Sequence, residues 1–107
     1  MQEFIGEYVT VRANLAGCFA GKVESIASPN ADGTVNVVLS ESRQLWRWWT
    51  PVGQGVAGVA EHGLASNSEV RVGAQQSGPQ LIASVFQLNT CTPAAEASIR
   101  TRSPVQP

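Results

Sequence analysis

Apolar and polar residues alternate along much of the first half of the chain, with the period that a half-buried β-strand produces. The pattern predicts strands over residues 8–12, 18–26, 34–39 and 43–50. The sequence SPNADG at residues 28–33 combines Pro, Asn and Asp-Gly, so it predicts a hairpin turn between the second and third strands. Four consecutive strands with short connections favour an antiparallel meander.

The second half of the chain carries helical as well as strand signals. Apolar residues in VGQGVAGVAEHGLA have the spacing of a helix of one or two turns, which we expect to end at Gly63. Residues 69–72 and 81–88 predict further strands. A Thr-Pro dipeptide before residues 94–99 supplies an N-cap and a favoured first helical residue, which predicts a second helix. The expected fold class is α+β: an antiparallel β-sheet of about six short strands with two small helices.

Length and charge fit one small domain. The 107 residues suit a single domain, with a core over about residues 4–100 and a mobile tail over 101–107. Only 14% of the residues are charged, against about 25% in a typical protein. Such a neutral surface favours a homo-oligomer. The net charge of -1 attracts neither DNA nor an anionic membrane, and no stretch reaches the ~18 apolar residues of a membrane-spanning helix. We therefore expect an intracellular protein.

Groups that could catalyse a reaction are scarce in this sequence. His62 is the single histidine, and the two cysteines, Cys18 and Cys91, are far apart with no second histidine to complete a metal site. We interpret both cysteines as reduced, partly buried thiols; a disulfide is the alternative for a secreted chain. The carboxylates are scattered, and no glycine-rich phosphate-binding motif is present. We expect no enzymatic activity, metal or cofactor.

The segment RQLWRWWT, residues 43–50, holds all three tryptophans and two of the six arginines. In a regular strand the odd-numbered residues share one face and the even-numbered residues the other. Arg43 and Arg47 would then lie about 13 Å apart on one face and could meet two phosphates. A Trp ring beside a guanidinium suits a nucleobase with its phosphate. The alternative is core packing by the tryptophans, with the arginines directed outward.

Several short strings occur in an order that resembles a known family. VRANLAG is followed by RQLWRWW, EHG, VFQLNTCT and AAEASI. This order is similar to that of small phage and prophage proteins that include the Thoeris anti-defence sponges, over about residues 4–99. The resemblance implies an antiparallel sheet with small helices, assembled as dimers or hexamers. It also implies binding, without cleavage, of cyclic nucleotide signals such as glycocyclic ADP-ribose isomers and, in some members, cyclic trinucleotides.

The resemblance also suggests site residues. The ligand-binding candidates are Arg43, Trp46, Arg47, Trp48, Arg71 and Arg100; Arg47, Arg71 and Arg100 lie at variable or poorly matching positions. The candidates for a second ligand site or an oligomer axis are Arg12, Ala16 and Gly17. Cys91 and Thr92 match a later string and are interpreted as structural.

The expected function is that of a phage sponge in the cytoplasm of the infected bacterial host, which blocks activation of Thoeris or CBASS-type effectors. One alternative is a single-stranded nucleic-acid-binding protein, since aromatics and arginines on a strand suit that role as well. Another is a phage structural or interaction module in which the tryptophans form a protein interface. The preferred cyclic nucleotide, the number of ligand sites and the choice between dimer and hexamer are open at this point.

Overall fold

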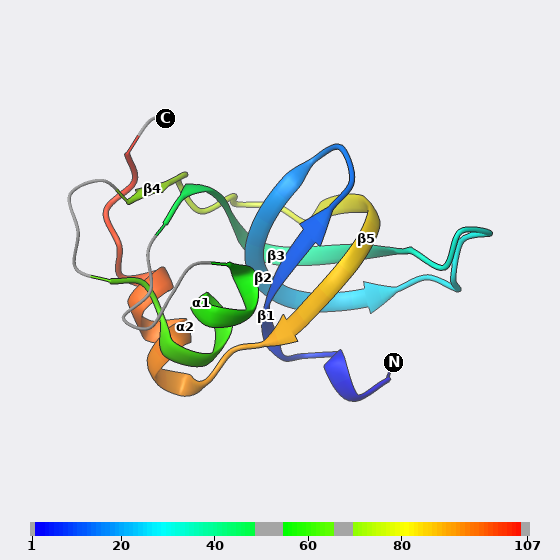
Figure 1. Ribbon diagram of the computed structural model, residues 1–107, viewed down its shortest axis with the longest axis horizontal. Coiled ribbons are helices and arrows are strands. Elements are labelled where there is room, and N and C mark those ends of the chain that lie inside the picture. Colours follow the sequence, from blue (N-terminus) through cyan, green and yellow to red (C-terminus); the bar gives the residue numbers. More distant parts are fainter. Residues whose placement is uncertain (1, 49–54, 66–69, 106–107) are drawn as a thin grey trace.

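The computed structural model describes residues 2–48, 55–65 and 70–105, and its fold is α+β with an antiparallel sheet, as the sequence predicts (Figure 1). Within these residues five strands and two α-helices follow a single turn of 3-10 helix, η1. In chain order the elements are η1 (Gln2–Phe4), β1 (Tyr8–Ala13), β2 (Gly17–Ile26), β3 (Val35–Arg47), α1 (Val56–His62), β4 (Arg71–Val72), β5 (Gln80–Thr90) and α2 (Pro93–Arg100).

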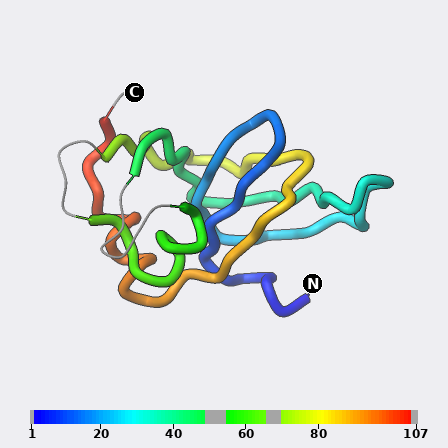
Figure 2. Tube along the Cα trace, viewed as in Figure 1, coloured from blue at the N-terminus to red at the C-terminus, as the bar shows by residue number. Residues whose placement is uncertain are grey.

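The paired strands of the sheet form a closed ring. β2 pairs with β1 and β3, and β5 also pairs with β1 and β3, each pair antiparallel. Four strands therefore form a ring, and β4 pairs with the end of β3 beyond it. Figure 2 shows these strands curling around one another, with the helices to one side of them. The order is not a simple meander, because β5 lies between β1 and β3.

Two apolar clusters stabilise this arrangement. The inner cluster fills the ring and consists of Val9, Val11, Ala13, Phe19, Val23, Val37, Leu39, Ile82 and Val85. The outer cluster joins the ring to β4 and both helices and consists of Tyr8, Cys18, Ala20, Leu45, Val56, Val59, Val70, Val72 and Ile99. Alternate residues of β1 thus serve different clusters, as the period of two requires. The buried Thr10 hydroxyl donates to the Val56 carbonyl at 2.9 Å, which ties α1 to the sheet.

The sequence predicts separate strands over 34–39 and 43–50, whereas the structure has one long strand, β3. Glu41 has a left-handed φ of 53°, which is uncommon for a residue with a side chain. Nearby, the pairing of β2 with β3 shifts register between Ala20 and Lys22. The irregularity bends β3 without ending it, so the sheet formed by the described residues has five strands rather than six.

Several local predictions are confirmed. α1 ends at Gly63, which has a positive φ of 84° and whose N–H donates to the Val59 carbonyl at 2.8 Å. The Thr92 hydroxyl accepts a hydrogen bond from the Ala95 N–H at 3.2 Å and caps α2. In the turn before β3, the Asp32 carboxylate accepts from both the N–H and the hydroxyl of Thr34, at 3.0 and 2.6 Å. These features depend on residues close together in sequence.

Residues 101–105 lie against β4 and the segment that precedes it. The Val105 N–H donates to the Val72 carbonyl at 3.0 Å. Arg102 Nη1 donates to the Ala65 carbonyl at 3.1 Å. The mobility of the tail stays a prediction. Of the helices in the described part of the chain, none has the length and apolar character to cross a membrane.

Candidate functional site

The tryptophan-rich segment follows β3 out of the ring. Arg43 and Leu45 are buried on the side of β4 and α2, and Leu45 belongs to the outer cluster. Gln44 and Trp46 lie on the opposite face, where they line a pocket. The predicted alternation is therefore correct for these four residues.

A β-bulge interrupts the alternation after this point. The pairing of β3 with β4 shifts register between Leu45 and Arg47, and Trp48 packs against the outer cluster. Trp46 and Trp48 therefore do not share a face, and the sequence prediction was wrong here because a bulge places an extra residue in one strand. Residues 49 and 50 of the segment lie outside the described residues.

Arg43 has a structural role. The residue is 3% exposed, and its Nε donates to the Gly73 carbonyl at 2.7 Å and its Nη1 to the Ile99 carbonyl at 2.6 Å. These bonds tie β3 to the segment after β4 and to the end of α2. Burial lowers the pKa of the guanidinium from its ordinary value. The prediction that Arg43 contacts a ligand is therefore revised, because a ligand cannot reach a buried guanidinium whose bonds hold the backbone.

The pocket beside Trp46 lies at the end of the ring and has a volume of about 220 Å³. Its lining residues are all neutral: Phe19, Gln44, Trp46, Gly73, Ala74, Gln76 and Gln80. Trp46 is 37% exposed, and its ring packs against Gly73, where an added Cβ would lie 3.2 Å from the ring atom Cη2. Glycine thus lets the indole lie close to the backbone, with part of its surface open to a ligand.

Two glutamine amides in this pocket are held by hydrogen bonds. Gln44 Nε2 donates to the Ala16 carbonyl at 3.3 Å. Gln80 Oε1 accepts from the Ser42 hydroxyl at 2.8 Å. Gly17 also borders this site, since a Cβ there would lie 3.6 Å from Gln44 Nε2. Sequence reasoning missed the glutamines, because a lone glutamine in a strand carries no motif.

The structure separates the predicted second group of site residues. Ala16 and Gly17 lie in the β1–β2 hairpin next to Gln44 and thus near Trp46. Arg12 is exposed on β1 and lies between Val11 and Ala13, whose side chains enter the inner cluster. Alternation places Arg12 on the outer face, away from the pocket.

Arg47 and Arg71 face each other across the β3–β4 pair. Arg47 is exposed, and Arg71 is half-buried with Nη1 donating to the Val70 carbonyl at 3.3 Å. Directly opposed residues in an antiparallel pair have Cβ atoms about 5 Å apart. Two positive charges therefore lie close together next to Trp46: Arg47 follows it on β3, and Arg71 lies opposite Arg47 on β4.

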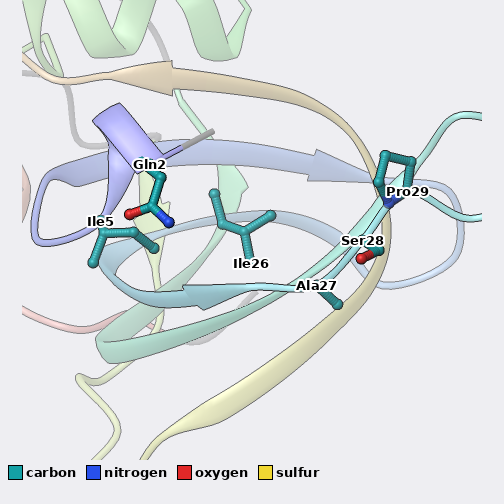
Figure 3. Close-up of a pocket in the computed structure, with 6 residues that line it drawn as sticks. All are labelled: Gln2, Ile5, Ile26, Ala27, Ser28 and Pro29. Atoms are coloured by element: carbon teal, nitrogen blue, oxygen red, sulfur yellow. The ribbon is translucent and has the colours of Figure 1, made fainter.

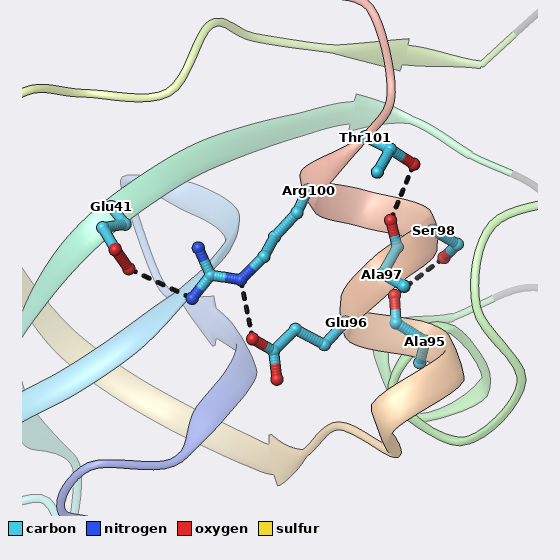
Figure 4. Close-up of polar contacts among 7 residues, drawn as sticks. All are labelled: Glu41, Ala95, Glu96, Ala97, Ser98, Arg100 and Thr101. Carbon is cyan, nitrogen blue, oxygen red and sulfur yellow. Dashed lines mark hydrogen bonds and ion pairs between the residues drawn. The ribbon is translucent and has the colours of Figure 1, made fainter.

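Arg100 is held on the helical side of the sheet by two carboxylates (Figure 4). Nε donates to Glu96 Oε2 at 2.6 Å and Nη2 to Glu41 Oε1 at 3.1 Å. The guanidinium carbon also lies 4.5 Å from the centroid of the Tyr8 ring, a cation–π distance. Burial raises the pKa of the Tyr8 hydroxyl, which has no hydrogen-bond partner among the described residues. Arg100 therefore links α2 to the bend in β3 and lies apart from the Trp46 pocket.

A second pocket, of about 250 Å³, lies between η1 and the end of β2 (Figure 3). Its walls are formed by Gln2, Ile5, Ile26, Ala27, Ser28 and Pro29. It offers aliphatic surface and small polar groups but neither an aromatic ring nor a charge. The Trp46 pocket has the richer binding chemistry of the two.

The groups considered for catalysis are dispersed. His62 is exposed at the end of α1. Cys18 and Cys91 are free thiols, and burial, followed by the negative charge of Glu96, raises the pKa of Cys91 to about 12. The described ranges contain no group of three side chains that could hold a metal ion. The absence of enzymatic activity stays a prediction.

Comparison with known proteins identifies a family whose function is unknown. A family model described as a domain of unknown function (DUF6948) matches residues 6–99, which is most of the chain. No curated protein and no solved structure matches the chain.

Proposed function

The chain belongs to the DUF6948 family, and for this member we propose a role as a non-catalytic sponge that binds cyclic nucleotide immune signals. The ligands are glycocyclic ADP-ribose isomers or cyclic trinucleotides, which remain intact. Their sequestration prevents activation of bacterial Thoeris or CBASS-type effectors. The protein acts as a homo-oligomer in the cytoplasm of the infected bacterial host. The proposal originates in the resemblance of the sequence motifs to phage anti-defence sponges.

The observation that carries the proposal is the Trp46 pocket. It combines an exposed part of an indole ring with neutral amide groups that are already oriented. Such a site suits a nucleobase, because the face of a base stacks on aromatic rings and its edge carries hydrogen-bond donors and acceptors. Stacking of one base contributes about 1–3 kcal/mol.

The size and charge of the surroundings indicate how a larger nucleotide would lie. Drug-sized ligands occupy pockets of about 300–1,000 Å³, so a pocket of about 220 Å³ suits one base rather than a whole cyclic nucleotide. The remainder would extend over the surface toward Arg47 and Arg71, which lie next to Trp46 along the β3–β4 pair. Guanidinium groups form strong hydrogen bonds to phosphate oxygens. The base and the phosphates thus have separate binding groups.

Calorimetric titration of the purified protein tests this proposal. The panel consists of glycocyclic ADP-ribose isomers, cyclic ADP-ribose, cyclic trinucleotides and a single-stranded DNA oligonucleotide, with the oligomeric mass measured by light scattering. We expect a cyclic nucleotide to bind and Trp46→Ala to weaken binding by about 5- to 150-fold, the loss of one stacked base. Phe86→Ala is the matched control, because Phe86 is a 53% exposed aromatic on β5 outside the pocket lining.

Two results would contradict the sponge. One is the absence of binding to every cyclic nucleotide in the panel. The other is recovery of a hydrolysed product after the complex is heated, since a sponge returns its ligand intact. Preferential binding of the oligonucleotide with a steep salt dependence would favour the single-stranded nucleic-acid alternative.

A further inference from the structure

The two fixed glutamines of the Trp46 pocket present a defined donor–acceptor pair. Gln44 uses Nε2 to reach the Ala16 carbonyl, so its Oε1 has no hydrogen-bond partner among the described residues. Gln80 uses Oε1 to accept from Ser42, so its Nε2 has none there either. A primary amide has one acceptor oxygen and one donor nitrogen that cannot exchange places without rotating the whole group. In this arrangement Gln44 leaves its oxygen and Gln80 its nitrogen for a ligand.

The positions of these glutamines are determined by the backbone. Gln44 lies on β3 and Gln80 at the start of β5, and Gln80 is bonded to Ser42, which precedes Gln44 by two residues on β3. Ser42 is fully buried, and its carbonyl also accepts from the Gln76 N–H at 2.9 Å. This places the segment between β4 and β5 over the pocket. The acceptor of Gln44 and the donor of Gln80 thus belong to residues that line the same pocket.

We infer that Gln44 and Gln80 read the edge of one nucleobase that presents a donor beside an acceptor, with adenine as the simplest example. The inference rests on the proposed function and adds the specificity-determining residues. Gln44 Oε1 accepts from the exocyclic amine, and Gln80 Nε2 donates to a ring nitrogen, while Trp46 contacts the base face. Pairing of amide side chains with the donor–acceptor edge of adenine is a recurrent arrangement in base recognition.

The other lining residues fit this assignment. Gln76 is exposed, and its amide group is not held by any hydrogen bond within the described part of the chain, so it should contribute less to discrimination. Phe19 belongs to the inner cluster and also lines the pocket. Since all lining residues are neutral, the pocket favours a base over a phosphate.

The test compares two probes that differ by one group. They are 3′,5′-cyclic AMP and the same nucleotide with unsubstituted purine, which lacks the exocyclic amine. Binding is followed by NMR, through the Gln80 side-chain NH₂ and the Trp46 Nε1–H resonances, which report millimolar affinities. We expect the amine to strengthen binding by about ten-fold in the natural protein, the value of one well-formed hydrogen bond. In Gln44→Ala the two probes should bind equally.

The variant Gln80→Glu tests the second hydrogen bond of the inference, the one donated by Gln80 Nε2. It retains an oxygen for Ser42 but replaces the donor by an acceptor, so cyclic AMP binding should fall by ten-fold or more. Gln87→Ala is the matched control, because Gln87 lies on β5 outside the pocket lining and bonds to Asn89. Thermal unfolding of each variant shows whether a loss of binding comes from a loss of fold.

The outcomes separate this inference from the sponge itself. Cyclic nucleotides that bind through Trp46 without preference for the amine, or with a preference that persists in Gln44→Ala, would overturn the base-reading role alone. The same holds if larger cyclic nucleotides bind and cyclic AMP does not. No binding by any member of the full panel would overturn the proposed function and this inference with it.

Discussion

Replacement of Arg43 by methionine tests the structural role that we assign to this residue. Methionine fills much of the space of the arginine stem but cannot donate to the carbonyls of Gly73 and Ile99. Both bonds are short, at 2.7 and 2.6 Å, and the residue is almost fully buried. The substitution therefore removes a connection between β3, the segment after β4 and the end of α2.

The expected loss in the free energy of unfolding follows from these contacts. A hydrogen bond to a charged group contributes about 1.5–3 kcal/mol, and two of them give about 3–6 kcal/mol. Release of a buried guanidinium from its desolvation cost offsets part of this loss. The Ile99 carbonyl also keeps a bond from the Arg102 N–H at 3.3 Å. We expect Arg43→Met to lower the free energy of unfolding by about 2–4 kcal/mol, a large share of the 5–15 kcal/mol typical of small domains.

Urea unfolding followed by tryptophan fluorescence measures this change. Arg12→Met is the matched control, because Arg12 is exposed on β1, and exposed substitutions usually stay within about 0.5 kcal/mol. A loss below about 0.5 kcal/mol in Arg43→Met would refute the argument. If that stable variant also lost nucleotide binding, the role of Arg43 would be ligand contact, as the sequence motif suggested.

Three further predictions concern Gly63, which follows α1, and Cys91, which lies between β5 and α2. Gly63→Ala should destabilise the protein by about 1–3 kcal/mol, because the residue has φ 84° and its Cβ would lie 2.7 Å from Ser98 Oγ. Gly33→Ala has a similar φ of 88° but nothing within 4 Å, so the difference between the two variants in thermal unfolding measures the clash; equal losses would argue against it. Burial raises the pKa of Cys91 to about 12, so iodoacetamide should modify it slowly at pH 8 in the folded protein and rapidly in urea, as mass spectrometry would detect. The folded thiol keeps its proton where the unfolded thiol loses it, so stability should fall as the pH rises from about 9 to about 12, and less so in Cys91→Ala; an equal fall in both would contradict the assigned pKa.

The candidate site was only partly predictable. Trp46 was singled out by composition, and it is exposed at a pocket. Ala16, carried over from a family motif, lies beside that pocket, bonded to Gln44. The glutamines were not predicted, because their importance comes from which amide atom a distant partner holds. Arg43 matched the same motif as Trp46 but is buried, since neighbouring residues of a strand point to opposite faces.

Short-range physics determined the local features of this protein from its sequence alone. The Thr92 cap, the end of α1 at Gly63 and the alternation along β1 each depend on residues within a few positions of one another. Such features follow from hydrogen bonding and backbone sterics that any surrounding fold would respect. The α+β class with antiparallel strands follows from them.

The tertiary structure determined where the regular alternation of side chains between the two faces of β3 is interrupted. At Gly21 a Cβ would lie 3.1 Å from the Ser40 carbonyl oxygen and from Ser42 Cα, so β2 and β3 approach closely there. Glu41 adopts its left-handed φ at this crossing, and the residues beyond it change face: Leu39 enters the inner cluster, and Ser42 rather than Glu41 is the next fully buried residue. Closure of four strands into a ring imposes this bend. The alternation of apolar and polar residues in the sequence indicates only that each segment prefers to form a strand. The bend depends on how strands that are distant in sequence pack together.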